Sequence, residues 1–216
     1  MATYLETVNN VLRRLREPTV NSVNDTAYSA MIGIFVNDAK REVEDAADWN
    51  VLSTTITVNT VVDTYNYTLT GSGTRFRVID VLNDTKDVQM RSAPTTWMNT
   101  QFLMTSSQKS SPVYYNFNGV DSSNDTQVDL FPIPDAVEVL RFNLIVPQAQ
   151  LTSDSTAIKV PSHLIEMLAY AKAIAERGED GGNLSSEAYA LYKNALANEI
   201  AIERNHYDDE MTWTAN

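Results

Sequence analysis

Apolar residues recur at helical spacing in two segments near the start of the chain. The first, residues 3–15, ends at the Glu17-Pro18 dipeptide, because proline disfavours a continuing helix. The second begins after Asn24 or Asp25, either of which can cap a helix, and continues to about Asp48. The apolar faces of the two segments consist of Leu5, Val8, Leu12 and Leu15, and of Tyr28, Met31 or Ile32, Phe35, Ala39, Val43 and Ala46. The pattern predicts two amphipathic helices.

The same spacing returns near the end of the chain. A third helix is expected to start at Val160-Pro161-Ser162 and to stop at Gly178, and a fourth follows the turn at residues 178–182. Their apolar stripes are Leu164, Ile165, Leu168, Ala171 and Ala175, and Leu184, Ala188, Leu191, Ala195 and Ile202. Since neither helix can bury its stripe alone, the pattern predicts an antiparallel helical hairpin with these stripes inside.

Between the helical segments, from Trp49, threonine, valine and tyrosine accumulate in alternation, which is typical of strands. Strands are expected at 51–59, 61–69, 75–82, 113–118, 127–131 and 137–146, and a short helix near 95–104. Gly71-Ser72-Gly73 marks a turn. The first three strands are predicted to form a small meander.

The order of elements predicts an α+β protein. The simplest way to bury four amphipathic stripes is a four-helix bundle built from both chain ends, interrupted by an inserted antiparallel β domain that is a small sheet or barrel. The expected divisions are 1–52 for the first half of the bundle and 53–147 for the β domain. The second half of the bundle spans 148–206, and a tail spans 207–216.

Composition and charge narrow the function classes. The 216 residues are 43% apolar and include no cysteine, which excludes disulfides, thiolate metal sites and cysteine nucleophiles. The formal charge of −12, with scattered basic residues, argues against a dedicated nucleic-acid binder. No apolar run approaches the length of a membrane span, so we expect a soluble protein made in the cytoplasm.

Residues that could carry chemistry do not form a convincing constellation. His163 and His206 are far apart in sequence, and neither has an evident partner for a metal or a general base. Carboxylate pairs such as Glu6 with Glu17, or Asp45 with Asp48, could in principle serve a glycosidase, but 28 acidic residues produce such pairs by chance. The loop at 121–125 lacks the spacing of a calcium-binding EF-hand. No catalytic residue, cofactor or metal is therefore predicted.

The tail is more informative. Residues 207–216 contain Tyr207, Met211 and Trp213, which are residue types enriched at protein interfaces. A terminal segment is usually a polar, loosely held end. Composition alone leaves a docking peptide and a free end equally open.

Four stretches together resemble the head-to-tail adaptor family of tailed bacteriophages, known in short-tailed phages as the head-tail connector or tail tubular protein A. They are Thr7-Val-Asn-Asn-Val-Leu-Arg-Arg-Leu-Arg-Glu-Pro-Thr-Val20, Val36-Asn-Asp-Ala-Lys-Arg-Glu-Val43 continuing to Trp49-Asn50-Val51, Asp129-Leu-Phe-Pro-Ile-Pro-Asp135, and Val160-Pro161 with the helix to Gly178. Their order along the chain carries the resemblance. In that family a glycine often precedes the Glu-Pro turn, where this chain has Arg16.

The resemblance implies a structural protein of the virion at the head-tail interface. Such proteins form a ring, usually of twelve copies, beneath the portal protein and carry the tail nozzle and tail fibre proteins below. Helices line the ring wall and the C-terminal segment reaches the portal, which would make Tyr207, Met211 and Trp213 the portal-docking residues. An acidic channel would let DNA pass without specific binding.

Two alternatives remain open at the level of sequence. A virion-associated peptidoglycan hydrolase would need two carboxylates at a defined separation in a cleft. A receptor-binding or glycan-binding tail module would use an aromatic face of the β domain, with Tyr65, Tyr67, Tyr114 and Tyr115 as the candidates. The copy number, the state of the free protein, the channel-lining acidic residues and the host do not follow from the sequence.

Overall fold

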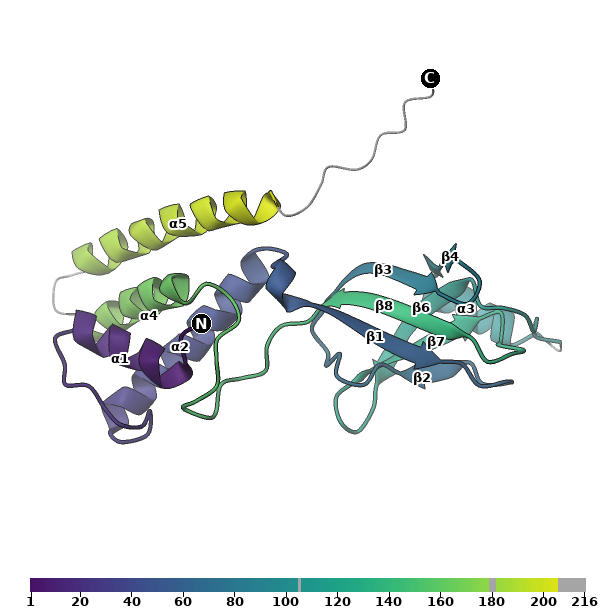
Figure 1. The fold of residues 1–216 in the computed structure, drawn as a ribbon, viewed down its shortest axis with the longest axis horizontal. Helices are drawn as coiled ribbons and strands as arrows, with labels where there is room; N and C mark the ends of the chain where they lie inside the picture. The colour runs from purple at the N-terminus through teal and green to yellow at the C-terminus, as the bar shows by residue number, and fades with distance from the viewer. Residues whose placement is uncertain (105, 179–181, 206–216) are drawn as a thin grey trace, which may run out of the picture. The chain divides into compact units, whose positions relative to one another are not determined.

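The computed structural model describes residues 1–104, 106–178 and 182–205, and it divides the chain into two compact units. One unit combines the two ends of the chain, Met1–Leu52 and Pro147–Asn216, and contains four α-helices and a short 3-10 helix in its described part. The other, Ser53–Val146, contains all eight described strands and a short helix (Figure 1). The protein is therefore α+β.

Helix α1 spans Tyr4–Arg14 and begins with a capping box. The Thr3 side chain accepts a hydrogen bond from the Glu6 N–H, and the Glu6 carboxylate accepts one from the Thr3 N–H at 2.8 Å. These bonds satisfy N–H groups that the first turn of a helix leaves without partners. Just past the helix end, Arg16 adopts φ 59°, in the left-handed region that glycine usually takes there.

Helix α2 spans Ala27–Ala46, and its cap is Thr26 rather than the predicted Asn24 or Asp25. The Thr26 hydroxyl accepts a hydrogen bond from the Ser29 N–H at 2.9 Å, while the buried Ser29 hydroxyl donates to the Val23 carbonyl. Asp25 instead stabilises the preceding turn, where its carboxylate accepts from two backbone N–H groups. The prediction failed because Asn24, Asp25 and Thr26 are all residue types that can cap a helix. Asp25 is engaged in the turn, and Thr26 is the cap.

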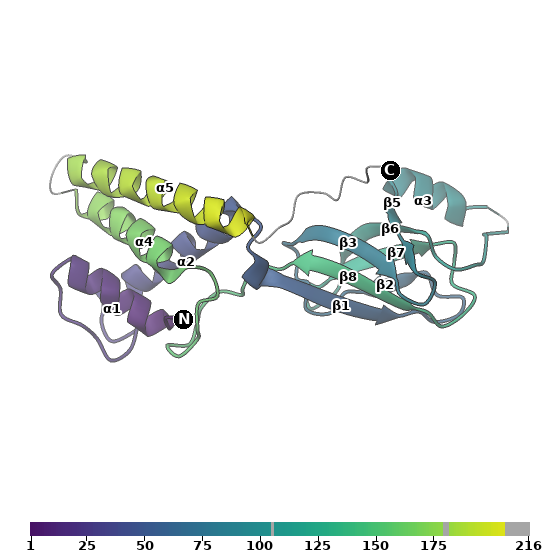
Figure 2. The ribbon, with the colours of Figure 1, turned by 45° about the horizontal axis from the view of Figure 1, so that its top comes forward.

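Helices α4 (Ser162–Arg177) and α5 (Asn183–Arg204) complete this unit. Helices α1, α2 and α4 each pack on the other two, whereas α5 packs chiefly on α4 (Figures 1 and 2). The buried side chains of α4 include Leu164, Ile165 and Leu168. The arrangement is thus three mutually packed helices with a fourth laid on one of them, and a regular four-helix bundle is not established.

The predicted inner stripe of α5 is wrong in large part. Leu184, Leu191 and Ile202 are each more than half exposed, at 55%, 54% and 55%. The buried positions of this helix are Ala188 and Tyr192. Ala188 belongs to the predicted stripe but Tyr192 does not, so the packed side of α5 is turned away from Leu184, Leu191 and Ile202.

The β unit consists of two four-stranded sheets. One has the order β1-β8-β3-β4 and the other β2-β7-β6-β5, and neither closes into a barrel. The strands are β1 Ser53–Asn59, β2 Asn66–Thr68, β3 Arg77–Asn83, β4 Val88–Gln89, β5 Arg91–Ser92, β6 Tyr114–Val120, β7 Thr126–Phe131 and β8 Val139–Ile145. All pairings are antiparallel except β5 with β6.

The predicted meander of the first three strands is also wrong. Strands β1 and β3 both pair with β8, while β2 pairs with β7 in the other sheet. Alternation along a strand shows which face is buried but not which strand lies beside it. The most apolar strand, β8, occupies an interior position, and its Leu140, Phe142 and Leu144 are fully buried.

The core of the β unit is built from inward-facing residues of both sheets, including Val81, Met90, Val128, Leu130 and Phe142. A second, smaller core lies where helix α3, Thr95–Phe102, packs on strand β6. There Trp97 contacts the rings of Tyr114 and Phe131, with centroids 5.0 and 5.4 Å away.

Candidate interaction surfaces

A row of exposed apolar side chains runs along α5 of the helical unit. Leu184, Leu191 and Ile202 are seven and eleven residues apart, which is close to whole helical turns, so they lie in one line on the helix. We call these three residues the α5 stripe. Exposed aliphatic side chains in a row are typical of a surface that another protein covers.

A shallow groove lies on another side of the same helix, between α5 and the end of α2. Its volume is about 460 Å³. The apolar part of the lining comes from Ala46, Tyr189, Leu196 and Ile200, and Glu42 adds a carboxylate at its edge. Burial raises the pKa of Tyr192 to about 12, and the charge of Glu42 adds to that rise.

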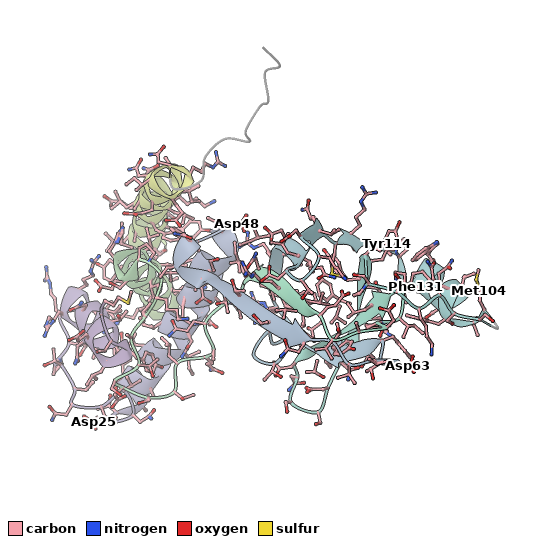
Figure 3. All side chains as sticks on the ribbon, turned by 45° about the vertical axis from the view of Figure 1, so that its right-hand side comes forward. Asp25, Asp48, Asp63, Met104, Tyr114 and Phe131 are labelled. Carbon is pink, nitrogen blue, oxygen red and sulfur yellow. The ribbon has the colours of Figure 1, made fainter. Side chains whose placement is uncertain are left out.

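Exposed apolar side chains also gather at one end of the β unit. Leu103 and Met104 follow α3 with 85% and 53% of their surfaces exposed. Tyr65, itself 43% exposed, stacks on Phe102 with ring centroids 4.5 Å apart. Figure 3 shows Met104 beyond Phe131 and Tyr114, at the far end of this unit. Sequence reasoning missed this surface because polar residues dilute the segment around it.

Buried charges in the helical unit have structural partners. Lys40 donates hydrogen bonds to both oxygens of Glu44 at 3.2 Å and to the Gln148 carbonyl at 2.6 Å. Both side chains are at most 4% exposed. Glu166 of α4 accepts from Asn10 of α1 at 2.8 Å. These bonds connect the two chain ends, since Lys40 and Asn10 precede the β unit while Gln148 and Glu166 follow it.

Two of the carboxylates considered for a hydrolase, Glu6 and Glu17, have structural roles. Glu6 caps α1, and Glu17 forms an ion pair with Arg177. Glu42, at the groove, pairs with Lys172 at 2.6 Å. Asp45 also lines the groove, and Asp48 lies at the end of α2 (Figure 3). Nothing in this geometry favours a pair of carboxylates acting as acid and base.

The loop at 121–125 is held by its own backbone. Asp121 accepts hydrogen bonds from the Ser123 and Asp125 N–H groups at 2.8 and 2.9 Å. Hydrogen bonds from the backbone of Gly71 and Gly73 lower the pKa of Asp125. Within the described residues, no group of three or more histidine or acidic side chains could hold a metal ion. The loop is therefore an Asx turn braced against the Gly71–Gly73 turn.

His163 lies in the first turn of α4, where its Nε2 is 3.3 Å from Glu199 of α5. The contact joins the two helices at the surface. His206 lies outside the described residues.

The four tyrosines considered for a glycan-binding face are not on one face. Tyr115 is buried in the core of the β unit, whereas its neighbour Tyr114 points to the opposite side of the sheet, against Trp97. The Tyr67 hydroxyl donates to the Thr64 carbonyl at 2.8 Å. Only Tyr65 is substantially exposed, so the structure does not support an aromatic binding platform.

The portal-docking residues predicted from sequence, Tyr207, Met211 and Trp213, lie outside the described residues. The structure describes the helix that leads to them. Near its end, Glu203 accepts a hydrogen bond from the Asn50 N–H at 2.5 Å, which fixes the end of α5 to the short 3-10 helix Asn50–Leu52. The described end of α5 is therefore held in place within the helical unit.

Comparisons with known proteins identify the family. No curated protein matches the chain significantly. None of the described helices is long and apolar enough to cross a membrane. The family model described as SU10 adaptor protein matches residues 2–214, which is nearly the whole chain and includes both units and the tail. The chain belongs to the SU10 adaptor protein family, a family of phage adaptor proteins and hence of virion components, as the resemblance predicted.

Proposed function

We propose that this protein forms a ring of twelve copies between the capsid portal and the tail nozzle of a phage virion. The match to the SU10 adaptor protein family over residues 2–214 carries the proposal. In this proposal α1, α2, α4 and α5 act as one four-helix bundle in the ring wall. The β insertion, 53–147, contacts tail proteins, and residues 207–216 dock on the portal.

The surface of α5 supports assembly from identical copies. The α5 stripe is apolar and exposed, while the faces that α1, α2 and α4 turn to one another are buried. Covering each of the three side chains would contribute on the order of 1 kcal/mol, since roughly half of each is already buried. A head-to-tail contact of this kind generates a ring when its rotation closes.

The charge distribution supports passage of DNA through the ring. Nineteen of the 28 acidic residues, but only ten of the 16 basic ones, belong to the unit that combines the chain ends. A wall with this excess repels phosphates and gives DNA no place to bind. The acidic balance therefore favours the helical unit as the channel lining.

The tail provides the test. A chain truncated after residue 206 should keep the far-ultraviolet circular dichroism and unfolding midpoint of the full chain but no longer bind purified portal rings in sedimentation. Replacing Tyr207, Met211 and Trp213 together with alanine should weaken portal binding by at least about a hundredfold, because such residues carry most of the energy of an interface. Replacing Asp208 and Asp209 with asparagine is the matched control. Portal binding by the truncated chain would contradict the proposed docking.

A further inference from the structure

Strand β1 is an edge strand without the usual protection. The other three sheet edges are β4, β2 and β5, which have two, three and two residues. Strand β1 has seven and pairs with β8 in unbroken register. Its sequence, Ser-Thr-Thr-Ile-Thr-Val-Asn, contains no charged residue and no proline. Natural sheets normally shorten, charge or bulge an edge of this length, because it is a template for another strand.

Two hydrogen bonds fix which backbone groups of β1 face outward. The Thr60 N–H donates to the Glu138 carbonyl at 2.9 Å, so the pairs that bond β1 to β8 are those of even-numbered residues. The Val139 carbonyl accepts a hydrogen bond from the N–H of Asp84, just after β3, and so points away from β1. This agrees with pairing through the even-numbered residues of β1. The N–H and C=O groups of Ser53, Thr55, Thr57 and Asn59 therefore face away from β8.

The side chains beside this edge suit an added strand. Thr55 and Thr57 are exposed, and the Thr55 hydroxyl donates to the Asn143 side chain at 2.6 Å on the polar outer face of the sheet. On the inner face Ile56 is only half-buried against the core of the β unit. A strand that continued the sheet would cover Ile56 with one apolar side chain and flank the threonines with small polar ones.

We propose that the β1 edge accepts an extended segment of a different protein of the virion as a fifth strand of this sheet. A second copy is a poor donor, since the other edge strands in the described residues have at most three residues. The parts of β3 and β6 that extend past β4 and β5 are each interrupted by a shift in register, which makes them poor templates for a strand. Pairing β1 with β1 gives a two-fold dimer, which closes at two copies and cannot continue around a ring. Main-chain hydrogen bonds over about 20 Å would provide affinity, as in other strand-addition complexes.

The donor is assigned to the tail nozzle protein. This assignment rests on the proposed function, in which residues 207–216 already make the portal contact. The segment it requires is extended, at least four residues long, and alternates apolar with small polar side chains. The segment needs no charged residue, because β1 contains no charged residue that could pair with one.

Residue-resolved amide hydrogen exchange tests the proposal on the wild-type chain in three states: alone, on portal rings, and on portal rings with purified nozzle protein. In the free protein Thr55, Thr57 and Asn59 should exchange rapidly, and Ile56 and Val58 slowly. Addition of the nozzle protein should slow the odd-numbered amides by about a hundredfold and leave the even-numbered ones unchanged. This alternation distinguishes strand addition from general shielding.

A proline variant provides a second readout. Thr57→Pro removes an outward N–H and places a ring on the edge without breaking a bond to β8, so the fold should survive. It should reduce nozzle protein retained on portal-bound adaptor at least about tenfold. Thr68→Pro makes the same change at an outward position of β2 and is the matched control.

Each other outcome overturns the proposal. Protection of the odd-numbered amides in the protein alone, with dimers in sedimentation, would make a second copy the occupant. Protection on portal rings before nozzle protein is added would assign the strand to the portal. Nozzle binding without protection would remove strand addition while leaving the adaptor function intact. Failure to bind portal rings at all would refute both the proposed function and this inference.

Discussion

Helices α4 and α5 are neighbours in sequence and in space, yet their side chains are buried to very different degrees. Helix α4 has seven buried residues in sixteen, and α5 has two in twenty-two. The same contrast exists in the β unit, where, among the described strands, β8 is paired on both edges and β1 on only one. Within the described residues of one chain, α4 packs on three helices and β8 is paired on both edges, whereas α5 keeps an exposed apolar side and β1 keeps an unpaired edge. The open elements are the ones we expect a partner to complete.

Breaking the buried ion pair should have the largest effect on the completed region. Lys40→Met leaves the Glu44 carboxylate buried without its cation and should lower the free energy of unfolding by about 3–5 kcal/mol. Lys172→Met is the matched control, because its partner Glu42 is 48% exposed and the pair is worth about 0–1 kcal/mol. Urea denaturation of both variants measures the difference. Equal effects would show that the helical unit does not exclude water from Lys40.

A pair of leucine substitutions compares α4 with α5 directly. Leu164→Ala on α4 creates a cavity at a fully buried site and should cost about 2–5 kcal/mol. Leu191→Ala on α5 removes a half-exposed side chain and should change stability by at most about 0.5 kcal/mol. Thermal unfolding of the isolated protein checks both values. A large loss for Leu191→Ala in the free chain would mean that the α5 stripe is already covered.

The one bulky buried side chain of α5 gives a prediction about pH. The folded-state pKa of Tyr192 is about 12, above the ordinary value of about 10, so folding favours the neutral phenol. The raised pKa contributes on the order of 2 kcal/mol to the free energy of unfolding. This contribution is complete below pH 10 and is lost as the pH rises toward 12. Unfolding free energies measured from pH 9 to 12 should therefore fall less steeply in Tyr192→Phe. The same slope in both proteins would contradict burial of this hydroxyl.

The smallest expected effect is a gain. Arg16 has φ 59°, which costs a non-glycine residue about 1 kcal/mol. Arg16→Gly should raise the free energy of unfolding by about 0.5–1 kcal/mol, partly offset by the greater freedom of glycine in the unfolded chain. Arg13→Gly, inside α1, is the matched control and should destabilise by about 1 kcal/mol. Chemical denaturation would contradict this if both variants lost stability.

The sequence predicted the elements better than their partners. The apolar period located all four helices of the chain ends, and alternation located β1, β3, β6, β7 and β8 within a few residues. Periodicity could not show that β8 lies between β1 and β3, because pairing depends on contacts far apart in the chain. It also did not show that Tyr192, which lies outside the predicted stripe of α5, is buried while its neighbour Leu191 is exposed.

The candidate site was predictable only in part. The resemblance predicted an adaptor of the phage virion, and the match to the SU10 adaptor protein family supports that. Portal docking by Tyr207, Met211 and Trp213 stays a prediction. The free edge of β1 had no sequence signal of its own, because an outward N–H differs from a paired one only in register.

Electron microscopy of the full-length protein mixed with purified portal rings is the direct test of the proposed ring. We expect a closed ring of additional density beneath the portal, with one copy of the adaptor at each repeat and its helical units forming the wall. Portal rings that remain unchanged at a large excess of the protein would contradict it.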